Sequence, residues 1–599
     1  MGSQTGVFYF DKGRILPEEA GALIGNLFPS DAAEAAFYRD SGVLLIQGGD
    51  VSGAMTFDGR LDNRGDLAAR FGVRLGDNTS DGEIVRAVYD HCGAAGFVHL
   101  IGDWSLALWN AAERCVVLAS DYAGIRPLYY AVQPHGAVWS TRLGPLVDLL
   151  KADEIDDRFV ASFLRYGDCP HRTPYASILP VLAGHSVTIN RHGVKVQRFW
   201  EPPAGRVIRY KDESAYEEQL RSLFAEAVRC RLSTNEPVLA ELSGGFDSSS
   251  VVSMASRLIA RHDVEAPEVV TLTSEHAGSL DARFYRAVEK HCEIARAIHV
   301  STDALRFLTE SDTGGASPAF WDNKDKQLGE IAGNLGAKTY LTGLLGDLVM
   351  GNWFDDSEQV AGFLRRNPKR ALYEAFLWSK HLRIPIYGIL WNAFWKSLPA
   401  AFVPTGAPLR QASPGDAAQG DSLTPAFRKR VDSPDEGFSQ FWKQAQPERR
   451  KHVRCLTETL ELRKLRPPEP LENLAFTHPY SHRPLVEFML TIPAEVVTRP
   501  GEPRFLMRKA LHFLWPPELQ GRRSKDSFGG MFIDTIRPFA QTLLEQPLEV
   551  VERGYVDRRQ VDERLNKLLR GLEANALQLQ QIILLELWLR GRRARSTEA

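Results

Sequence analysis

The sequence predicts a two-part fold, in which a β-rich α+β part is followed by an α/β part built on a parallel sheet. Up to about residue 200, short apolar segments such as 43–46 and 116–119 alternate with Gly- and Asp-containing turns, a pattern typical of short β-strands. Further along, the apolar segments 237–240 and 268–273 each precede a helical pattern, which is typical of parallel strands joined by helices. The length of 599 residues allows two or more domains.

The composition excludes several classes of protein. With 44% hydrophobic residues, 25% charged residues and a net charge of −3, the chain offers no electrostatic footprint for nucleic acid and no basic face for a membrane. Its six cysteines show no CxxC pairing, so they predict neither a zinc site nor a disulfide framework, and a reducing cytoplasm is the expected location. No apolar run approaches the roughly 18 residues of a membrane helix.

Four segments of the first part are informative in their order along the chain. They are Asp58–Leu67, Ser80–Val85, Gly102–Asn110 and Asp121–Tyr130. Together they resemble the glutaminase domain of asparagine synthetase. The resemblance implies an N-terminal-nucleophile fold, with stacked antiparallel sheets between helices, over residues 1–205. A second domain is then expected over 206–599.

The nucleophile of such a glutaminase is absent from the sequence. The family uses an N-terminal cysteine, whose free α-amino group assists as base. Here Met1 is followed by Gly2, neither Ser3 nor Thr5 would become the first residue after removal of Met1, and the first cysteine is Cys92. We therefore expect a glutaminase domain without activity, kept as a scaffold.

The second part begins with a linker at 202–205 and an amphipathic helix over 212–232, which leads into the most informative stretch, 241–250. This stretch reads as the end of a strand, a tight loop and the start of a helix. Gly244 and Gly245 allow backbone N–H groups to approach an anion closely, serine hydroxyls add donors, and the helix N-terminus favours negative charge. The loop is therefore expected to bind phosphate.

Asp247 is the unusual member of this loop. A carboxylate in a phosphate cradle repels its ligand unless a divalent cation lies between them, so we expect Asp247 to bind Mg²⁺. No lysine follows the glycines, so the loop is not of the Walker type. It resembles the pyrophosphate loop of ATP-pyrophosphatases, which split ATP between the α and β phosphates and transfer AMP to a carboxylate. The alternative is an ordinary Gly/Ser turn. The nucleotide-binding residues expected here are Leu242, Ser243, Gly244, Gly245, Asp247, Ser248 and Ser249, with Gly346 from a second loop.

That second loop lies in 338–351, which reads as a strand ending in a Gly-rich turn. It resembles the family segment that places a second Mg²⁺ ligand opposite the first, which makes Asp347 the partner of Asp247. Two carboxylates at adjacent strand ends can hold Mg²⁺ against a triphosphate. The alternative role for Asp347 alone is a helix N-cap.

The divergent insertion at about 352–450 contains Trp378, Trp391 and Trp395, which we expect in a helical core rather than in a substrate groove. Within it, residues 404–437 are expected to form a flexible loop. The resemblance returns at 481–493 and 504–511 and ends with 522–530. A lysine of this last segment reaches the active site in the family, so Lys525 is expected to act as an electrostatic catalyst. Its alternative role is that of a surface lysine in a basic turn with Arg522 and Arg523.

The resemblance implies an ATP- and Mg²⁺-dependent carbon–nitrogen ligase that forms AMP and pyrophosphate. Three residues before the second carboxylate, asparagine synthetases carry Glu and β-lactam synthetases carry Tyr. This chain has Leu344, which moves no proton. The tryptophan-rich insertion and the segment 481–487 look like lasso peptide macrolactam synthetases. Such an enzyme activates an Asp or Glu side chain of a precursor peptide, and the peptide's own N-terminal amine closes the ring.

Three alternatives remain: an ammonia-using asparagine synthetase, a β-lactam synthetase-like cyclase, and a non-catalytic nucleotide-binding scaffold. The expected partners are the precursor peptide and, with it, a leader-binding protein and a leader peptidase, without nucleic acid or membrane. For the general base the sequence offers only two candidates, His482 and Glu487.

Overall fold

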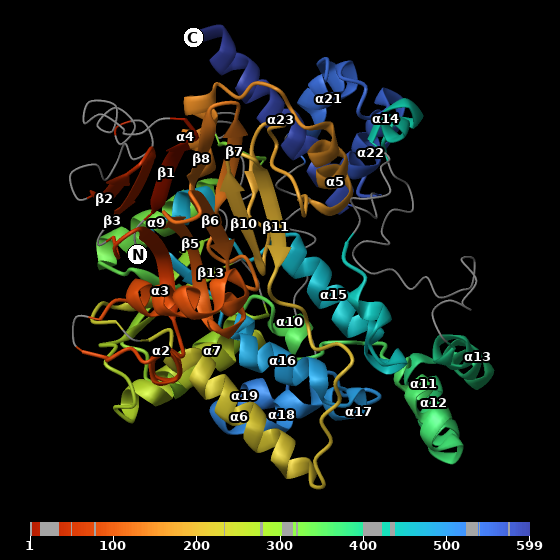
Figure 1. The fold of residues 1–599 in the computed structure, drawn as a ribbon. Helices are drawn as coiled ribbons and strands as arrows, with labels where there is room; N and C mark the ends of the chain where they lie inside the picture. Colours follow the sequence, from red (N-terminus) through yellow and green to blue (C-terminus); the bar gives the residue numbers. More distant parts are fainter. Residues whose placement is uncertain are drawn as a thin grey trace.

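The computed structural model describes residues 3–11, 25, 35–48, 51–76, 79–232, 234–275, 280–301, 315–318, 322–398, 422–431, 438–522, 537, 539–572 and 576–598. The antiparallel strands gather in one part of the molecule, helices α6, α16, α18 and α19 lie at the opposite side, and α11 to α13 project at the edge (Figure 1). The bounds are α6 (Glu213–Arg229), α16 (Arg483–Thr491), α18 (Phe505–Leu511) and α19 (Pro517–Gln520). For the projecting helices they are α11 (Gln359–Arg366), α12 (Pro368–Leu382) and α13 (Ile386–Ser397).

The first part holds two antiparallel sheets, which confirms the predicted stacked arrangement. One sheet has the order β2 (Ala35–Asp40), β3 (Val43–Gly48), β1 (Gln4–Tyr9), β8 (Gly136–Ser140), β7 (Tyr129–Gln133) and β9 (Leu179–Pro180). The other has the order β11 (Gly193–Arg198), β10 (His185–Asn190), β6 (Cys115–Ser120), β5 (Gly102–Asn110) and β4 (Met55–Leu61). Apolar residues of both inner faces, such as Phe8 and Trp109, fill the space between the sheets because strand side chains alternate between faces.

Helices cover the outer faces of these sheets and include the end of the chain. They are α2 (Arg64–Phe71), α3 (Asp81–Cys92), α4 (Leu143–Leu150) and α5 (Asp157–Tyr166). The final helix α23 (Ala576–Glu598) packs on α5, and their apolar residues share one buried cluster with helix α22 (Arg558–Leu569). The C-terminal helix therefore anchors on the first part of the chain.

The second part is built on a parallel sheet, as the strand–helix alternation predicts. Its order is β14 (Arg296–Ser301), β13 (Val269–Glu275), β12 (Val238–Glu241), β15 (Thr339–Leu341) and β16 (Ala475–Thr477), with every neighbouring pair parallel. Helices α7 (Phe246–Ala260), α8 (Ala282–His291) and α9 (Asp322–Leu335) follow β12, β13 and β14 along the chain. The carboxyl ends of β12 and β15 are neighbours, which is where an open parallel sheet binds ligands.

The insertion differs from the prediction in two respects. Trp378 is fully buried in a small core formed by α11, α12 and α13, as expected, but Trp391 is exposed. Within the expected flexible loop 404–437, residues 425–431 form helix α14, because Phe427 inserts into the buried cluster beside Tyr555. The remainder, 404–421 and 432–437, lies outside the described residues.

The two parts meet through a buried ionic network, which we call the junction network: Arg60, Asp62, Asp103, Arg231, Thr477 and His482. Asp103 binds Arg60 at 2.9 Å and Arg231 at 3.1 Å, and it accepts a hydrogen bond from Thr477. Burial raises the pKa of Asp103, but Arg231 and Arg60 outweigh burial and hold it well below its usual range. The network thereby connects the end of α6, the start of β5, the end of β16 and the turn before α16.

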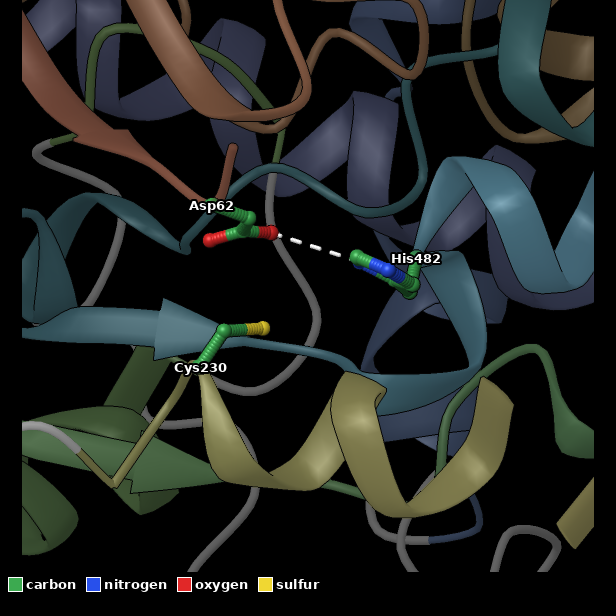
Figure 2. Close-up of side chains that lie close together, drawn as sticks. All are labelled: Asp62, Cys230 and His482. Carbon is green, nitrogen blue, oxygen red and sulfur yellow. Dashed lines mark ion pairs between the residues drawn. The ribbon is translucent and has the colours of Figure 1, made fainter. Parts of the chain in front are cut away.

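At one end of this network, Asp62 forms an ion pair with Nδ1 of His482 at 3.3 Å, and the thiol of Cys230 lies close to both (Figure 2). Burial raises the pKa of this thiol to about 12. These are metal-ligand residue types. However, Arg60 already binds Asp62 at 2.8 Å, and Nη1 of Arg231 lies 3.3 Å from the sulfur. The positive charges of these two guanidinium groups oppose the binding of a metal cation, so we assign the cluster to the junction.

Candidate nucleotide and metal site

The loop between β12 and α7 has the geometry of an anion site. Gly244 has φ of +75°, in the left-handed region, and a Cβ at this position would lie 3.1 Å from the backbone of Asp281 and Tyr285. Gly245 is the N-cap of α7 and provides no side-chain cap, so the first N–H groups of this 15-residue helix keep their capacity to bind an anion. The strand, the loop and the helix all lie where the sequence predicts them.

Serine hydroxyls organise this loop from within. Ser243 and Ser248 hydroxyls lie 3.0 Å apart, and the Ser248 hydroxyl also accepts the N–H of Ser243 at 3.1 Å. Ser249 is completely buried, and its hydroxyl finds no hydrogen-bond partner in the described part of the chain. Leu242 is buried as well and continues the β12–β13 pairing through its N–H. Among the expected phosphate ligands, the residues with partly accessible positions are therefore Ser243 and Gly245.

Asp347 lies opposite Asp247, as the second motif predicts. It occupies the first turn of the short helix α10 (Gly346–Val349), whose N-cap is Leu345 and not an aspartate, so the N-cap alternative for Asp347 is wrong. Gly346 makes the approach possible: a Cβ there would lie 2.7 Å from Cγ of Asp247. The two loops can approach this closely only because position 346 has no side chain.

A single guanidinium joins the two carboxylates. Nη2 of Arg504 donates to Asp247 at 2.5 Å and also to Asp347. Arg504 is buried and has a left-handed backbone (φ 55°), held by a hydrogen bond from its N–H to the carbonyl of Gly351. A strained backbone at a residue of this kind is typical of functional sites. The family resemblance at 504–511 covers Arg504 but implies no role for it.

The carboxylate pair fits a divalent cation. Mg²⁺ takes hard oxygen ligands, and it is commonly bound through one or two carboxylates together with phosphate oxygens. In the structure, Arg504 supplies the positive charge that two converging carboxylates require. Asp347 keeps half of its side chain exposed, so the pair is open on one side to a ligand.

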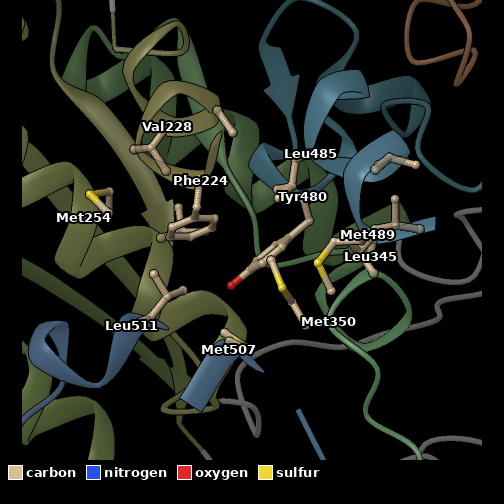
Figure 3. Packing of buried hydrophobic residues seen from close by; sticks show 14 of the residues in the cluster. Phe224, Val228, Met254, Leu345, Met350, Tyr480, Leu485, Met489, Met507 and Leu511 are labelled. Carbon is tan, nitrogen blue, oxygen red and sulfur yellow. The ribbon is translucent and has the colours of Figure 1, made fainter. Parts of the chain in front are cut away.

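A core of buried apolar side chains lies next to the loop that carries Asp247 (Figure 3). Tyr480 lies in it, and its hydroxyl donates to the backbone carbonyl of Asp247 at 3.1 Å. Burial is the main reason that the pKa of Tyr480 is raised well above 10, so the phenol keeps its proton. Met350 and Met489 contribute to the same cluster. The backbone of the loop that carries Asp247 is therefore fixed by a buried neutral donor.

The loop that carries Asp347 is held by a histidine. Nε2 of His478 lies 2.8 Å from the carbonyl of Leu465, which can only accept, so Nε2 carries the proton and Nδ1 accepts from the hydroxyl of Thr342 at 2.6 Å. Thr342 in turn accepts the N–H of Leu344. Because His478 follows Thr477, the junction network continues directly into the turn that carries Asp347.

Lys525 and Arg523 lie outside the described residues, but Arg522 can be placed. It is buried rather than in a surface turn: its guanidinium donates to the carbonyl of Gly244 at 2.6 Å and to Asp281 at 2.5 Å. The last family segment therefore begins at the phosphate loop.

The two candidate bases contact other groups. His482 is paired with Asp62 in the junction network. Glu487 accepts the indole N–H of Trp200 at 2.9 Å. Leu344 is 43% exposed in the turn before α10.

Comparison with known proteins agrees with the fold. Residues 47–200 match the glutamine amidotransferase domain family, and residues 219–310 and 471–590 match the asparagine synthase family. The fold is thus that of an α/β domain on a parallel sheet, preceded by glutaminase-like antiparallel layers. Together with relatives named asparagine synthetase, these matches place residues 47–200, 219–310 and 471–590 in domain families of the asparagine synthetase superfamily.

Three relatives illustrate the extent of the similarity. The chain is 30% identical to Amidase chry2 of Gibberella zeae over 200 residues (32% of this chain, 29% of the relative). It is 32% identical to Amidase chyE of Penicillium rubens over 205 residues (30% and 27%), and 26% identical to Asparagine synthetase [glutamine-hydrolyzing] 3 of Bacillus subtilis over 206 residues (33% and 33%). The chain thus spans a third or less of the length of these curated relatives. Among the described residues, no helix is both long and apolar enough to cross a membrane.

Proposed function

We propose that this protein is an ATP-dependent carbon–nitrogen ligase, and specifically a lasso peptide macrolactam synthetase. Its substrate is a precursor peptide, of which it activates an Asp or Glu side chain for attack by the peptide's N-terminal amine. The observation that carries the proposal is the convergence of Asp247 and Asp347 on Arg504, beside a Gly/Ser phosphate loop. A leader-binding protein and a leader peptidase are the partners that such a substrate requires.

The reaction consists of two displacements. A carboxylate oxygen of the peptide attacks the α-phosphorus of ATP, and pyrophosphate leaves. The amine nitrogen then attacks the acyl carbon, loses a proton, and AMP leaves. Ser243 and the N-terminus of α7 bind the phosphates, and Asp247 and Asp347 hold Mg²⁺, which when bound offsets the charge of the leaving pyrophosphate. Lys525 is proposed to stabilise the anionic acyl-adenylate and the tetrahedral oxyanion.

Leu344 supports the macrocyclisation reading. Its side chain offers no proton transfer at the position where the resemblance places Glu in asparagine synthetases and Tyr in β-lactam synthetases. A folded peptide that holds its own amine beside the activated carbonyl gains from proximity, which can replace much of the contribution of a strong enzymic base. An intramolecular amine also needs no ammonia from a glutaminase.

The test is mass spectrometry of ATP-Mg²⁺ reactions with the leaderless precursor peptide encoded beside the gene, compared with aspartate plus ammonium. Loss of one water from the peptide, with AMP and pyrophosphate formed, is the expected result. Conversion of aspartate to asparagine would instead favour the ammonia-using alternative. Asp247→Ala is expected to abolish ring formation, and a normal macrocycle yield from this variant would refute its role as metal ligand.

A further inference from the structure

The insertion carries an unusual concentration of exposed apolar side chains. Eight of the eighteen large apolar residues that are exposed in the described chain lie between 354 and 394, at 42 to 74% exposure. They are Phe354, Leu372, Tyr373, Phe376, Ile384, Tyr387, Trp391 and Phe394. Isolated exposed apolar residues need no explanation, but such a group within 41 positions of sequence is typical of an interaction surface.

Six of these residues, all except Phe354 and Ile384, occupy the faces of α12 and α13 that the small core does not use. On α13, Tyr387, Trp391 and Phe394 recur at helical spacing, while Ile389 and Ala393 are buried on the other face. The ring centroids of Trp391 and Phe394 lie 6.5 Å apart, so these two side chains form one surface. We call Tyr387, Trp391 and Phe394 the aromatic stripe.

The charge around the stripe is strongly one-sided. Residues 359–398 contain seven lysines and arginines but a single acidic residue, Glu374. Three of the cations have carboxylate partners, and the other four are exposed without a carboxylate of the described residues within 4.0 Å. The four are Arg365, Lys369, Lys380 and Arg383. A partner for this region is therefore expected to carry apolar side chains together with carboxylates.

The surface is also physically continuous with the metal site. Asn352 donates to Oδ1 of Asp347 at 2.9 Å. Two residues further on, the exposed ring of Phe354 lies 4.9 Å from the ring of His381, which in turn contacts Trp378 in the core of the insertion. Exposed aromatic side chains therefore begin beside the loop that carries Asp347 and continue onto α12.

We propose that the aromatic stripe and the four cations bind an acidic, apolar segment of the peptide substrate, and hold the peptide while its carboxylate is activated. This proposal rests on the proposed function for the identity of the peptide, but the binding it describes requires neither ATP nor turnover. An amphipathic segment that lays its apolar side chains on the stripe would direct its carboxylates to Lys380 and Arg383, at the end of α12.

The test measures binding to the full-length protein without nucleotide. The probe is a fluorescein-labelled synthetic peptide of about 18 residues, made of Glu, Leu and Phe with apolar residues at helical spacing. The matched peptide has Lys in place of every Glu. Fluorescence anisotropy is expected to show binding of the acidic peptide only, weakened about tenfold or more by Tyr387→Ser/Trp391→Ser/Phe394→Ser. Lys380→Glu/Arg383→Glu should weaken it about threefold or more and reduce its salt dependence.

Two control variants match these changes elsewhere on the surface: Val194→Ser/Val196→Ser on the exposed strand β11, and Arg191→Glu/Lys195→Glu beside it. Both should bind the acidic peptide like the wild type. Equal binding of the two peptides, or no effect of the stripe variant, would overturn the proposal. The proposal would also be overturned if the wild-type protein sedimented with phosphatidylserine-containing vesicles, or self-associated in analytical ultracentrifugation, and the stripe variant lost that behaviour. A ligase assay that fails while binding follows the expected pattern would count against the proposed function alone.

Discussion

Asp103 and Arg231 form an ion pair of 3.1 Å that joins the two parts of the chain, and both side chains are almost completely buried. Arg231 follows α6, which packs beside α7, whereas Asp103 lies on β5 of the antiparallel layers. Thr477, at the end of β16, contacts both residues. The pair therefore connects the glutaminase-like sheets to the edge of the parallel sheet where the loop that carries Asp347 begins.

Removal of Arg231 should destabilise the protein far more than removal of a nearby surface arginine. Arg231→Met leaves Asp103 buried with one guanidinium in place of two, and breaking such a buried pair typically costs about 3–5 kcal/mol. Arg229→Met, two positions away, breaks only an exposed pair with Glu226 and should cost less than about 1 kcal/mol. Urea unfolding of both variants makes the comparison. Equal losses would show that the junction pair contributes no more than a surface pair.

A second prediction concerns Gly346. A methyl group there would lie 2.7 Å from the side chain of Asp247, which Arg504 holds in place. Gly346→Ala must therefore push apart the loops that carry Asp247 and Asp347. We expect a loss of about 1–3 kcal/mol in unfolding free energy, together with weaker binding of ATP-Mg²⁺ by calorimetry.

The control for this change is Gly333→Ala on α9, where a Cβ meets open space. In an exposed helix interior the added methyl group should leave stability unchanged or raise it by up to about 1 kcal/mol, with unaltered nucleotide binding. Normal ATP-Mg²⁺ affinity in Gly346→Ala would contradict the close approach of the loops.

The sequence could predict the parts of the site that are local in the chain. The loop at Ser243–Ser249 and the position of Asp347 follow from strand ends, glycines and single carboxylates within a few residues. Arg504 could not be predicted in this way, because its partners lie 257 and 157 positions away and nothing near it distinguishes it from other arginines. The exposure of Trp391 was also beyond the sequence, since an aromatic residue at helical spacing fits a core face and an interaction face equally well.

The pH dependence of stability should report on His478. Burial lowers the pKa of this histidine from 6.5 to about 4. Between these values the unfolded chain binds a proton that the folded chain does not, so the contribution of His478 is complete above pH 6.5 and is lost as the pH falls towards 4. The loss amounts to about 3 kcal/mol by linkage.

His478→Gln isolates this effect, because an amide can still accept from Thr342 and donate to the carbonyl of Leu465 but does not titrate. Urea unfolding from pH 7 to pH 4 should show a smaller decrease in unfolding free energy for the variant than for the wild type. Other histidines whose pKa is lowered by burial, such as the half-buried His185 and the buried His452, are common to both proteins and cancel in the difference. Parallel curves for the two proteins would mean that His478 is protonated in the folded state.

The last prediction tests whether the carboxylate pair binds a cation. Among the described residues, only Arg504 provides a guanidinium that contacts both Asp247 and Asp347. Arg504→Met therefore leaves the two converging carboxylates without this positive charge. In the presence of EDTA we expect a loss of about 2–4 kcal/mol in unfolding free energy, at the lower end of the range for buried pairs because Asp347 is half exposed. Millimolar Mg²⁺ should restore part of this loss, because a bound cation stabilises the folded state by mass action. The control is Lys509→Met, on the exposed side of α18. It should lose no stability in EDTA and gain none from Mg²⁺. If Mg²⁺ stabilises Arg504→Met no more than Arg504→Met/Asp247→Asn, the two carboxylates do not form a metal site, and the catalytic role proposed for them fails with it.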